Sequence, residues 1–196
     1  MSLLAVPFIF LFWLSDEAPF LVVAVLILIL NVVVLLFFRD PERRIGEGII
    51  SPADGRVTSI ERSKGRVLIS IFMNVNNVHV NRAPFDCHVI AMEHIPGGYV
   101  PAFRKDSDHN ERVVLTLGSR SGRCHLTQIA GTVARRIVTY VEKGDALSKG
   151  QRIGLIRFGS RVDLDVPFKS GMEIPVRVGD RVKAGTTTLL TGPGVP

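Results

Sequence analysis

Two Gly-Ser dipeptides, Gly118-Ser119 and Gly159-Ser160, place a serine hydroxyl beside a glycine carbonyl. A serine becomes a nucleophile once a base takes its proton, and a preceding glycine allows close approach to the backbone. Gly118-Ser119 lies among small and polar residues, which a hairpin loop explains. Gly159-Ser160 joins two strand-like runs and leaves a tail of 37 residues that begins with a strand. The dipeptide itself does not distinguish the two serines, but the flanks and the tail favour Ser160.

His79 is the histidine whose surroundings best suit a catalytic base. The chain has five histidines, none in a tight metal-ligand spacing, so no metal site is expected. Residues 76–84 read Asn-Asn-Val-His-Val-Asn-Arg-Ala-Pro, which is polar on both sides of the histidine and bounded by Pro84, as in a site loop. Imidazole is readily poised as a base near neutral pH.

Asp54 is an acidic residue in an ordinary sequence context. It lies in Ser-Pro-Ala-Asp-Gly at residues 51–55. An Asp-Gly pair after proline is a strong turn signal, so a turn explains Asp54 when it is taken alone.

Short strands must position these residues, because the chain from Ile49 onward shows no long helical periodicity. Glycine and proline punctuate it, and several runs alternate polar and apolar residues, as half-buried strands do. The fold class predicted is mostly β, with antiparallel sheets of a barrel-sandwich-like type. The strands expected are 55–60, 66–72, 88–95, 112–117, 124–129, 134–139, 152–156, 161–166, 173–176 and 187–191.

A weak internal echo supports this fold class. Residues 141–150 and 176–185 both read V-x-x-G-D-x-(L/V)-x-x-G. Gly-Asp turns followed by an apolar residue fit tight β connections. Such pairs recur in barrel-sandwich folds such as lipoyl and biotinyl carrier domains, which is an analogy of fold alone.

The N-terminal part predicts a membrane anchor. Residues 19–38 form a run of 20 residues in which only Asn31 is polar, long enough to cross a hydrocarbon core of about 30 Å. The basic sequence at 39–44 follows directly, which favours a cytoplasmic body. Residues 3–14 are apolar but short for a span, and predict the first arm of a helical hairpin. A signal peptide is the rival interpretation, but the basic n-region and a cleavage site are missing.

The composition divides the chain into an anchor at 1–38 and a basic body at 39–196. All 24 lysines and arginines lie in the body. Basic residues beside a membrane segment favour anionic lipid as the partner over nucleic acid, for which no motif is present. Two isolated cysteines, Cys87 and Cys124, predict idle thiols in a reducing compartment.

The chain resembles the phosphatidylserine decarboxylases, especially their short bacterial form and the archaeal archaetidylserine decarboxylases. The motifs that carry the resemblance are Phe-Arg-Asp-Pro-Glu-Arg at 38–43, Ser-Pro-Ala-Asp-Gly at 51–55, Asn-Val-His-Val-Asn-Arg-Ala-Pro at 77–84 and Arg-Phe-Gly-Ser-Arg-Val at 157–162. They follow the family's order, cover nearly the whole chain, and are specific together although each alone is weak.

The resemblance implies a proenzyme that cuts itself between Gly159 and Ser160. Asp54, His79 and Ser160 would form the self-processing triad, with Asp54 holding the tautomer of His79. The products would be a β chain, 1–159, and an α chain, 160–196, that stay together as a heterodimer. Ser160 would become a covalent pyruvoyl cofactor, which decarboxylates phosphatidylserine or archaetidylserine to the ethanolamine lipid.

The resemblance is incomplete at one position. Many longer relatives carry a second histidine, linked to decarboxylation, three residues before the triad histidine, and this chain has Asn76 there. Asn76, Asn77 and His79 itself are therefore the candidates for that step. Arg82, in the same loop, is a candidate partner for the headgroup phosphate, with an ordinary surface arginine as the alternative.

Two other functions remain open from the sequence. One is a membrane-anchored barrel-sandwich carrier or adaptor without catalysis, although no modifiable-lysine hairpin stands out. The other is a hydrolase that keeps Ser160, His79 and Asp54 as a lasting triad, although the G-x-S-x-G elbow is missing. A homo-oligomer is possible in each case.

Overall fold

The computed structural model describes residues 4–15, 18–98, 109–120, 122–131, 137–156 and 160–195. The chain divides into two compact units, Met1–Arg39 and Asp40–Pro196. Gly159, the proposed scissile residue, lies outside the described residues, as do expected strand residues 134–136.

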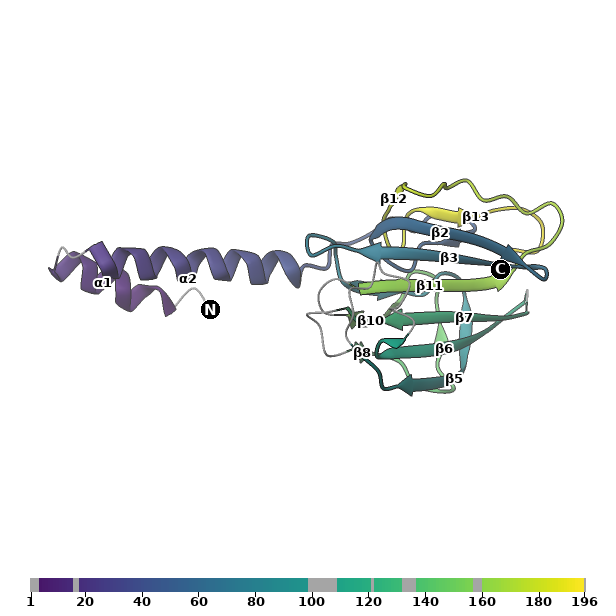
Figure 1. The fold of residues 1–196 in the computed structure, drawn as a ribbon, viewed down its shortest axis with the longest axis horizontal. Coiled ribbons are helices and arrows are strands. Elements are labelled where there is room, and N and C mark those ends of the chain that lie inside the picture. The colour runs from purple at the N-terminus through teal and green to yellow at the C-terminus, as the bar shows by residue number, and fades with distance from the viewer. Residues whose placement is uncertain are drawn as a thin grey trace. The chain divides into compact units, whose positions relative to one another are not determined.

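The first unit consists of two apolar helices, α1 (Val6–Ser15) and α2 (Ala18–Phe37), which pack against each other (Figure 1). Helix α2 has 20 residues and contains an 18-residue window with a mean hydropathy of 3.4, so it has the length and composition to cross a membrane. Its one polar side chain, Asn31, donates to the carbonyl of Ile27 at 2.7 Å, which satisfies the amide within the helix. The expected N-terminal helical hairpin is confirmed, whereas a membrane span by residues 3–14 stays untested.

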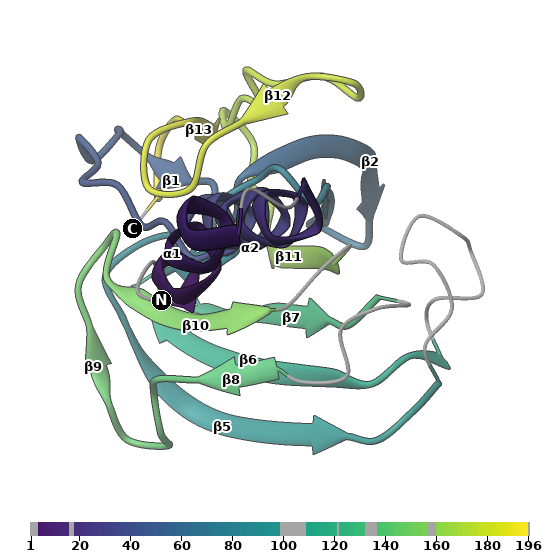
Figure 2. The ribbon, with the colours of Figure 1, turned by 90° about the vertical axis from the view of Figure 1, so that its left-hand side faces the viewer.

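The second unit is built from antiparallel strands, as predicted. The largest sheet has the order β12-β2-β3-β11-β7-β6-β5-β9, beside a sheet β4-β10-β8 and a pair β1-β13. Figure 2 shows how the large sheet curls from β2 to β5 and β9. The strands are β1 (Ile49–Ile50), β2 (Gly55–Ser63), β3 (Arg66–Met73), β4 (Val80–Arg82), β5 (Cys87–Ile95), β6 (Arg112–Ser119), β7 (Gly122–Ile129), β8 (Ile137–Thr139), β9 (Ala146–Leu147), β10 (Arg152–Ile156), β11 (Ser160–Pro167), β12 (Arg181–Val182) and β13 (Thr188–Leu190).

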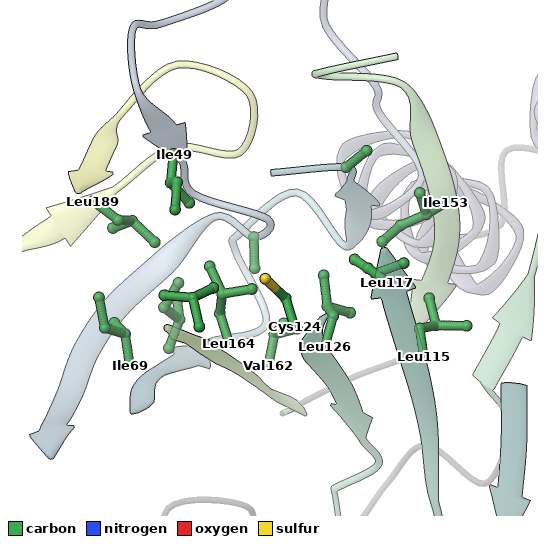
Figure 3. Packing of buried hydrophobic residues seen from close by; sticks show 14 of the residues in the cluster. Ile49, Ile69, Leu115, Leu117, Cys124, Leu126, Ile153, Val162, Leu164 and Leu189 are labelled. Carbon is green, nitrogen blue, oxygen red and sulfur yellow. The ribbon is translucent and has the colours of Figure 1, made fainter. Parts of the chain in front are cut away.

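Strand alternation explains the core. In β11 the residues at even positions from Ser160 to Val166 are buried, and those between them are half-buried. The buried side chains of β11 pack with Leu126 on β7 and Ile69 on β3, and all three sheets contribute to one hydrophobic cluster (Figure 3). This face places Ser160 at the end of a row of core residues.

The V-x-x-G-D echo is a structural repeat. Gly144 and Gly179 both have a φ of 99°, which favours glycine. The two turns cover equivalent places, since the amide of Gly144 donates to Val89 and that of Gly179 donates to Val57. Strand β9 then pairs with β5 as β12 pairs with β2.

The strands that the turns cover are also equivalent. Strand β2 shifts register between Val57 and Ser59, and β5 shifts between Val89 and Ala91. The body therefore contains two similar halves, which bears out the barrel-sandwich analogy at the level of fold.

One expected strand was wrong. Residues 173–176 form a single bridge from Glu173 to Thr191 and then leave the sheet. Pro175 lacks the amide that a ladder needs, which ends the pairing there. The strands β1, β4, β9 and β12 were not expected, because they have only two or three residues each and carry too little periodicity to show.

Candidate active site

Ser160 is the first residue of β11 and is completely buried. It pairs with Met73 at the end of β3. Among the described residues, its Oγ has no hydrogen-bond partner. A buried hydroxyl without a partner costs free energy, which is acceptable where the hydroxyl has a chemical role.

The end of β3 brings Ser160 and Asp54 toward each other. Arg56 on β2 is opposite Phe72, so the residue before it, Gly55, lies beside Met73 on the other side of β3 from Ser160. Two strand spacings are about 10 Å. Asp54, immediately before Gly55, therefore enters the same end of the sheet as the serine.

His79 joins this end through β10. The carbonyl of His79 accepts from the amide of Ile156 at 3.2 Å, and Ile156 is four residues before Ser160. The imidazole is completely buried. Its Nδ1 lies 2.8 Å from the carbonyl of Asn77. A carbonyl only accepts, so Nδ1 carries the proton, and Nε2 is the basic nitrogen of the neutral ring.

Asp54 has contacts other than the one expected. Its Oδ2 accepts from Arg43 at 2.9 Å, and its Oδ1 accepts from the amide of Ala184 at 2.7 Å. The acceptor at Nδ1 of His79 is the Asn77 carbonyl, not the Asp54 carboxylate. The aspartate is buried with Arg43, at side-chain exposures of 11% and 12%, so it is fixed in place beside the site.

The structural repeat supplies a comparison for Asp54. The equivalent residue in the other half is Asp86, which follows Pro84 as Asp54 follows Pro52. Oδ1 of Asp86 accepts from the amide of Lys149 at 2.7 Å, as Asp54 does from Ala184. The bond to the turn is thus common to both halves, whereas burial and the ion pair with Arg43 distinguish Asp54.

Arg82 lies within the body and contacts the segment that follows helix α2 in sequence. It is 6% exposed. Its Nη2 donates to Asp40 at 2.6 Å, and its Nη1 donates to the carbonyl of Gly150 at 3.0 Å. Binding of a phosphate by Arg82 stays a prediction, and it requires the guanidinium to be shared with Asp40.

The two asparagines before His79 differ in their surroundings. Asn76 is exposed, and Asn77 is half-buried. Asn77 closes a turn, since its Oδ1 accepts from the amide of Asn74 at 2.8 Å while its carbonyl accepts from His79. Asn77 is therefore the better placed of the two to influence the site.

The comparison with known proteins gives the family. The family pattern described as phosphatidylserine decarboxylase matches residues 30–190. The chain is 54% identical over 157 residues to a phosphatidylserine decarboxylase proenzyme of Streptomyces coelicolor, covering 79% of this chain and 71% of that one. The chain belongs to the phosphatidylserine decarboxylase family.

An archaeal relative of the phosphatidylserine decarboxylase family is also similar over most of its length. It comes from Methanosarcina acetivorans and is provisionally named an archaetidylserine decarboxylase proenzyme. The identity is 47% over 188 residues, which is 94% of this chain and 88% of that one. The expected family is confirmed, and its motifs coincide with the end of the sheet described above.

The other Gly-Ser pair lies where a hairpin turns. Ser119 ends β6 and pairs with Gly122 at the start of β7, and its Oγ donates to the carbonyl of Gly122 at 3.0 Å. Gly118 packs against the ring of His88 and has no room for a side chain there. The hairpin expected for Gly118-Ser119 is confirmed.

The sequence interpretation did not single out three polar residues that the structure places in or near this end of the sheet: Arg43, Asn81 and Gln128. Arg43 lies in a motif that was assigned to the membrane edge, and its partner Asp54 is not visible from sequence. Asn81 and Gln128 are completely buried and joined by a hydrogen bond of 2.8 Å. A glutamine at a core-facing position of an alternating strand is the signal that was available for Gln128.

Proposed function

We propose that this protein is a membrane-anchored, pyruvoyl-dependent decarboxylase of a serine phospholipid, activated by self-cleavage between Gly159 and Ser160. The observation that carries the proposal is Ser160: a buried hydroxyl without a partner among the described residues, at the end of β3 next to which Asp54 also lies. Membership of a family whose relatives are named proenzymes supports both the decarboxylation and the processing.

The processing reaction starts with His79. Its Nε2 takes the proton from the Ser160 hydroxyl, and the oxygen attacks the carbonyl of Gly159, so that the peptide becomes an ester. Loss of the Cα proton of residue 160 and of the Gly159 carboxylate leaves dehydroalanine. Tautomerisation and hydrolysis then release ammonia and give the pyruvoyl group.

The Asn77 carbonyl and Asp54 have separate roles in this scheme. The carbonyl fixes the His79 tautomer in which Nε2 is the basic nitrogen. Asp54, ion-paired with Arg43, supplies a fixed negative charge near the imidazolium that forms.

Decarboxylation needs an electron-accepting group, and a pyruvoyl carbonyl would supply it next to the amine of the headgroup. The residues present fit this group, because position 160 is completely buried and its hydroxyl has no hydrogen-bond partner among the described residues. The chain's part is to exclude water, to hold the headgroup, and to return a proton to the product. His79 and Asn77 are our candidates for the proton step, with Asn76 and Arg82 as candidate contacts for the substrate.

The reacting headgroup is the same in phosphatidylserine and archaetidylserine, and we propose serine phospholipid as the substrate class. The relatives include proteins named for each lipid. Decarboxylation assayed on vesicles of both lipids separates the two, and release of carbon dioxide from neither would contradict the proposed activity.

The anchor suits a substrate that stays in the bilayer. An enzyme held at the surface meets its lipid at a high effective concentration. We propose that α2 crosses the cell membrane and that the body lies on the cytoplasmic side, because basic residues follow the helix. Protease added to sealed, right-side-out cells should leave the body intact. Digestion of the body under these conditions would indicate the opposite orientation.

The test of processing is a denaturing gel with mass analysis of the purified chain. The wild type should give two fragments, the smaller of them residues 160–196, which stay together as a heterodimer under native conditions. Ser160→Ala should remain intact and Ser119→Ala should be cut normally. An intact wild type would favour a carrier or adaptor. Loss of cleavage in Ser119→Ala alone would assign the cofactor to residue 119.

The chemistry of the new terminus is tested by borohydride with ammonium salt. A pyruvoyl group is converted to alanine by reductive amination, which sequencing then detects. A free serine at the α-chain terminus would mean that simple hydrolysis occurred. Labelling of Ser160 by a fluorophosphonate, without reaction with phenylhydrazine, would favour the hydrolase.

A further inference from the structure

Gln128 is a buried polar side chain that the processing scheme does not use. It lies on β7 opposite Val162 of β11, and it is completely buried on the same face of the sheet. Val162 and Ser160 alternate with the half-buried Arg161 along β11, so Gln128 and Ser160 face the same interior, two residue positions apart along the strands.

Neighbouring groups fix the orientation of the Gln128 amide. Nδ2 of Asn81 donates to the carbonyl of Pro52 at 3.4 Å and contacts the sulfur of Met73 at 3.7 Å. Because a carbonyl only accepts, the amide nitrogen of Asn81 must lie on that side. Oδ1 of Asn81 then accepts from Nε2 of Gln128 at 2.8 Å.

This arrangement leaves the carboxamide oxygen of Gln128 as an acceptor. Among the described residues, Oε1 of Gln128 has no hydrogen-bond partner, and neither has Oγ of Ser160. Buried polar groups are normally hydrogen-bonded, so an exception of this kind needs an explanation. The Ser160 hydroxyl is used in the processing scheme, whereas Oε1 of Gln128 is not, so this oxygen indicates a place where a polar atom of a ligand completes the hydrogen bond.

We propose that Oε1 of Gln128 accepts a hydrogen bond from the amine of the serine headgroup and so positions that amine at residue 160. The inference rests on the proposed function and names a specificity residue for it. The headgroup's phosphate and carboxylate are anionic and only accept, so the amine is its one donor. A neutral acceptor oxygen therefore selects the amine and disfavours the anionic groups.

The test compares two lipids in the processed enzyme. Gln128→Met removes the acceptor at similar size, and Thr127→Val changes the opposite, half-buried face of the same strand as a matched control. Each variant is assayed on phosphatidylserine vesicles, with a competing phospholipid that has a 3-hydroxypropionate headgroup and so lacks only the amine. Cleavage of each variant is read on a denaturing gel.

The expected result is selective. Gln128→Met should be cut like the wild type and show a KM for phosphatidylserine raised about tenfold, the size of one lost hydrogen bond to a charged donor. The inhibition constant of the amine-free lipid should stay unchanged, and Thr127→Val should behave as the wild type. An equal loss for both lipids, or no loss for either, overturns the proposal.

A second variant covers the case in which Gln128→Met fails to fold or to be cut. Gln128→Glu, as a buried neutral acid, donates its O–H to Oδ1 of Asn81 and keeps a carbonyl oxygen as the acceptor, so its KM for phosphatidylserine should stay within about threefold of the wild type. A loss as large as that of Gln128→Met overturns the proposal, as does failure of cleavage in both variants. A wild type that is never cut contradicts the proposed function itself, so the two failures are distinguishable.

Discussion

At the scale of single residues, the comparison of Asp54 with Asp86 separates structure from chemistry. Both carboxylates accept from the amide of a turn at 2.7 Å. Only Asp54 is buried and ion-paired with an arginine. The protein thus contains two copies of one turn, of which one has acquired a charged partner at the candidate site.

Asp54→Asn should slow self-cleavage by at least about 100-fold, because the candidate site loses its fixed negative charge while the shape is kept. Asp86→Asn is the matched control, since it removes the equivalent charge in the other half, and in both variants the amide Oδ1 can still accept from the turn. The fraction cut is followed by gel during cell-free synthesis. Equal rates in the two variants would leave Asp54 with only its role in the turn.

The two cysteine thiols predict that the folded state loses stability at alkaline pH. Burial raises the pKa of Cys87 from 9.0 to about 12, with the charges of Cys124 and Asp86 adding to the effect. Burial also raises the pKa of Cys124 to about 11. The neutral thiols therefore stabilise the folded state below about pH 9, and this contribution is lost as the pH rises toward 12.

Urea unfolding at a series of pH values measures this effect. The midpoint should fall above pH 9 in the wild type, and Cys87→Ala should flatten that fall. A wild-type midpoint that rises over the same range would contradict the raised pKa values.

At the scale of elements, the segment Asp40–Arg43 links the site to the sequence that precedes it. Asp40 accepts from both Arg82 and Arg152, and Arg43 donates to Asp54. The segment thus holds β4, β10 and the turn before β2 through ion pairs. Its effect on the site is positional, because Arg43 contacts Asp54 and Asp40 contacts Arg82 on strand β4.

Arg43→Gln should slow self-cleavage by on the order of tenfold, because Asp54 loses its partner at Oδ2 in a buried setting. Arg44→Gln, which changes an exposed arginine next to it, should be cut at the wild-type rate. Arg43→Lys keeps the charge and should recover part of the rate. If Arg44→Gln were as slow as Arg43→Gln, the basic character of the segment, and not the ion pair, would be responsible.

The sequence predicted the strands better than it predicted the contacts between them. The alternation of β11 and the Gly-Asp turns are local, so their periodicity shows in the sequence. The acceptor for His79 is a backbone carbonyl, which every residue has, so sequence does not identify it. The pairing of Arg43 with Asp54 and of Asn81 with Gln128 depends on how distant segments meet, and patterns within one segment do not contain that information.

At the scale of the whole molecule, the segment from Ser160 onward contributes strands that pair with several strands of the preceding chain. Strand β11 pairs with β3 on one side and β7 on the other (Figure 1), β12 pairs with β2, and β13 pairs with β1. After cleavage, the α chain would remain bound by these ladders and by the core face of β11. The heterodimer is therefore expected to share one hydrophobic core.

Unfolding of the cut protein should depend on its concentration, because two chains separate when the shared core is lost. The Tm of the processed enzyme in detergent should rise as the protein is concentrated, whereas the Tm of uncut Ser160→Ala should stay constant. A processed enzyme whose Tm does not change with concentration would indicate that the α chain remains attached after unfolding.

The proposed assembly of Asp54, His79 and Ser160 into one site has a consequence for the order of events in the cell. These residues come from three segments far apart in the chain, and β3 must pair with both β2 and β11 to bring the segments of Asp54 and Ser160 together. Long-range pairing of this kind is among the slower steps of folding. A nascent or misfolded chain would then remain uncleaved and inactive. Cleavage would therefore occur only in chains whose sheet has formed.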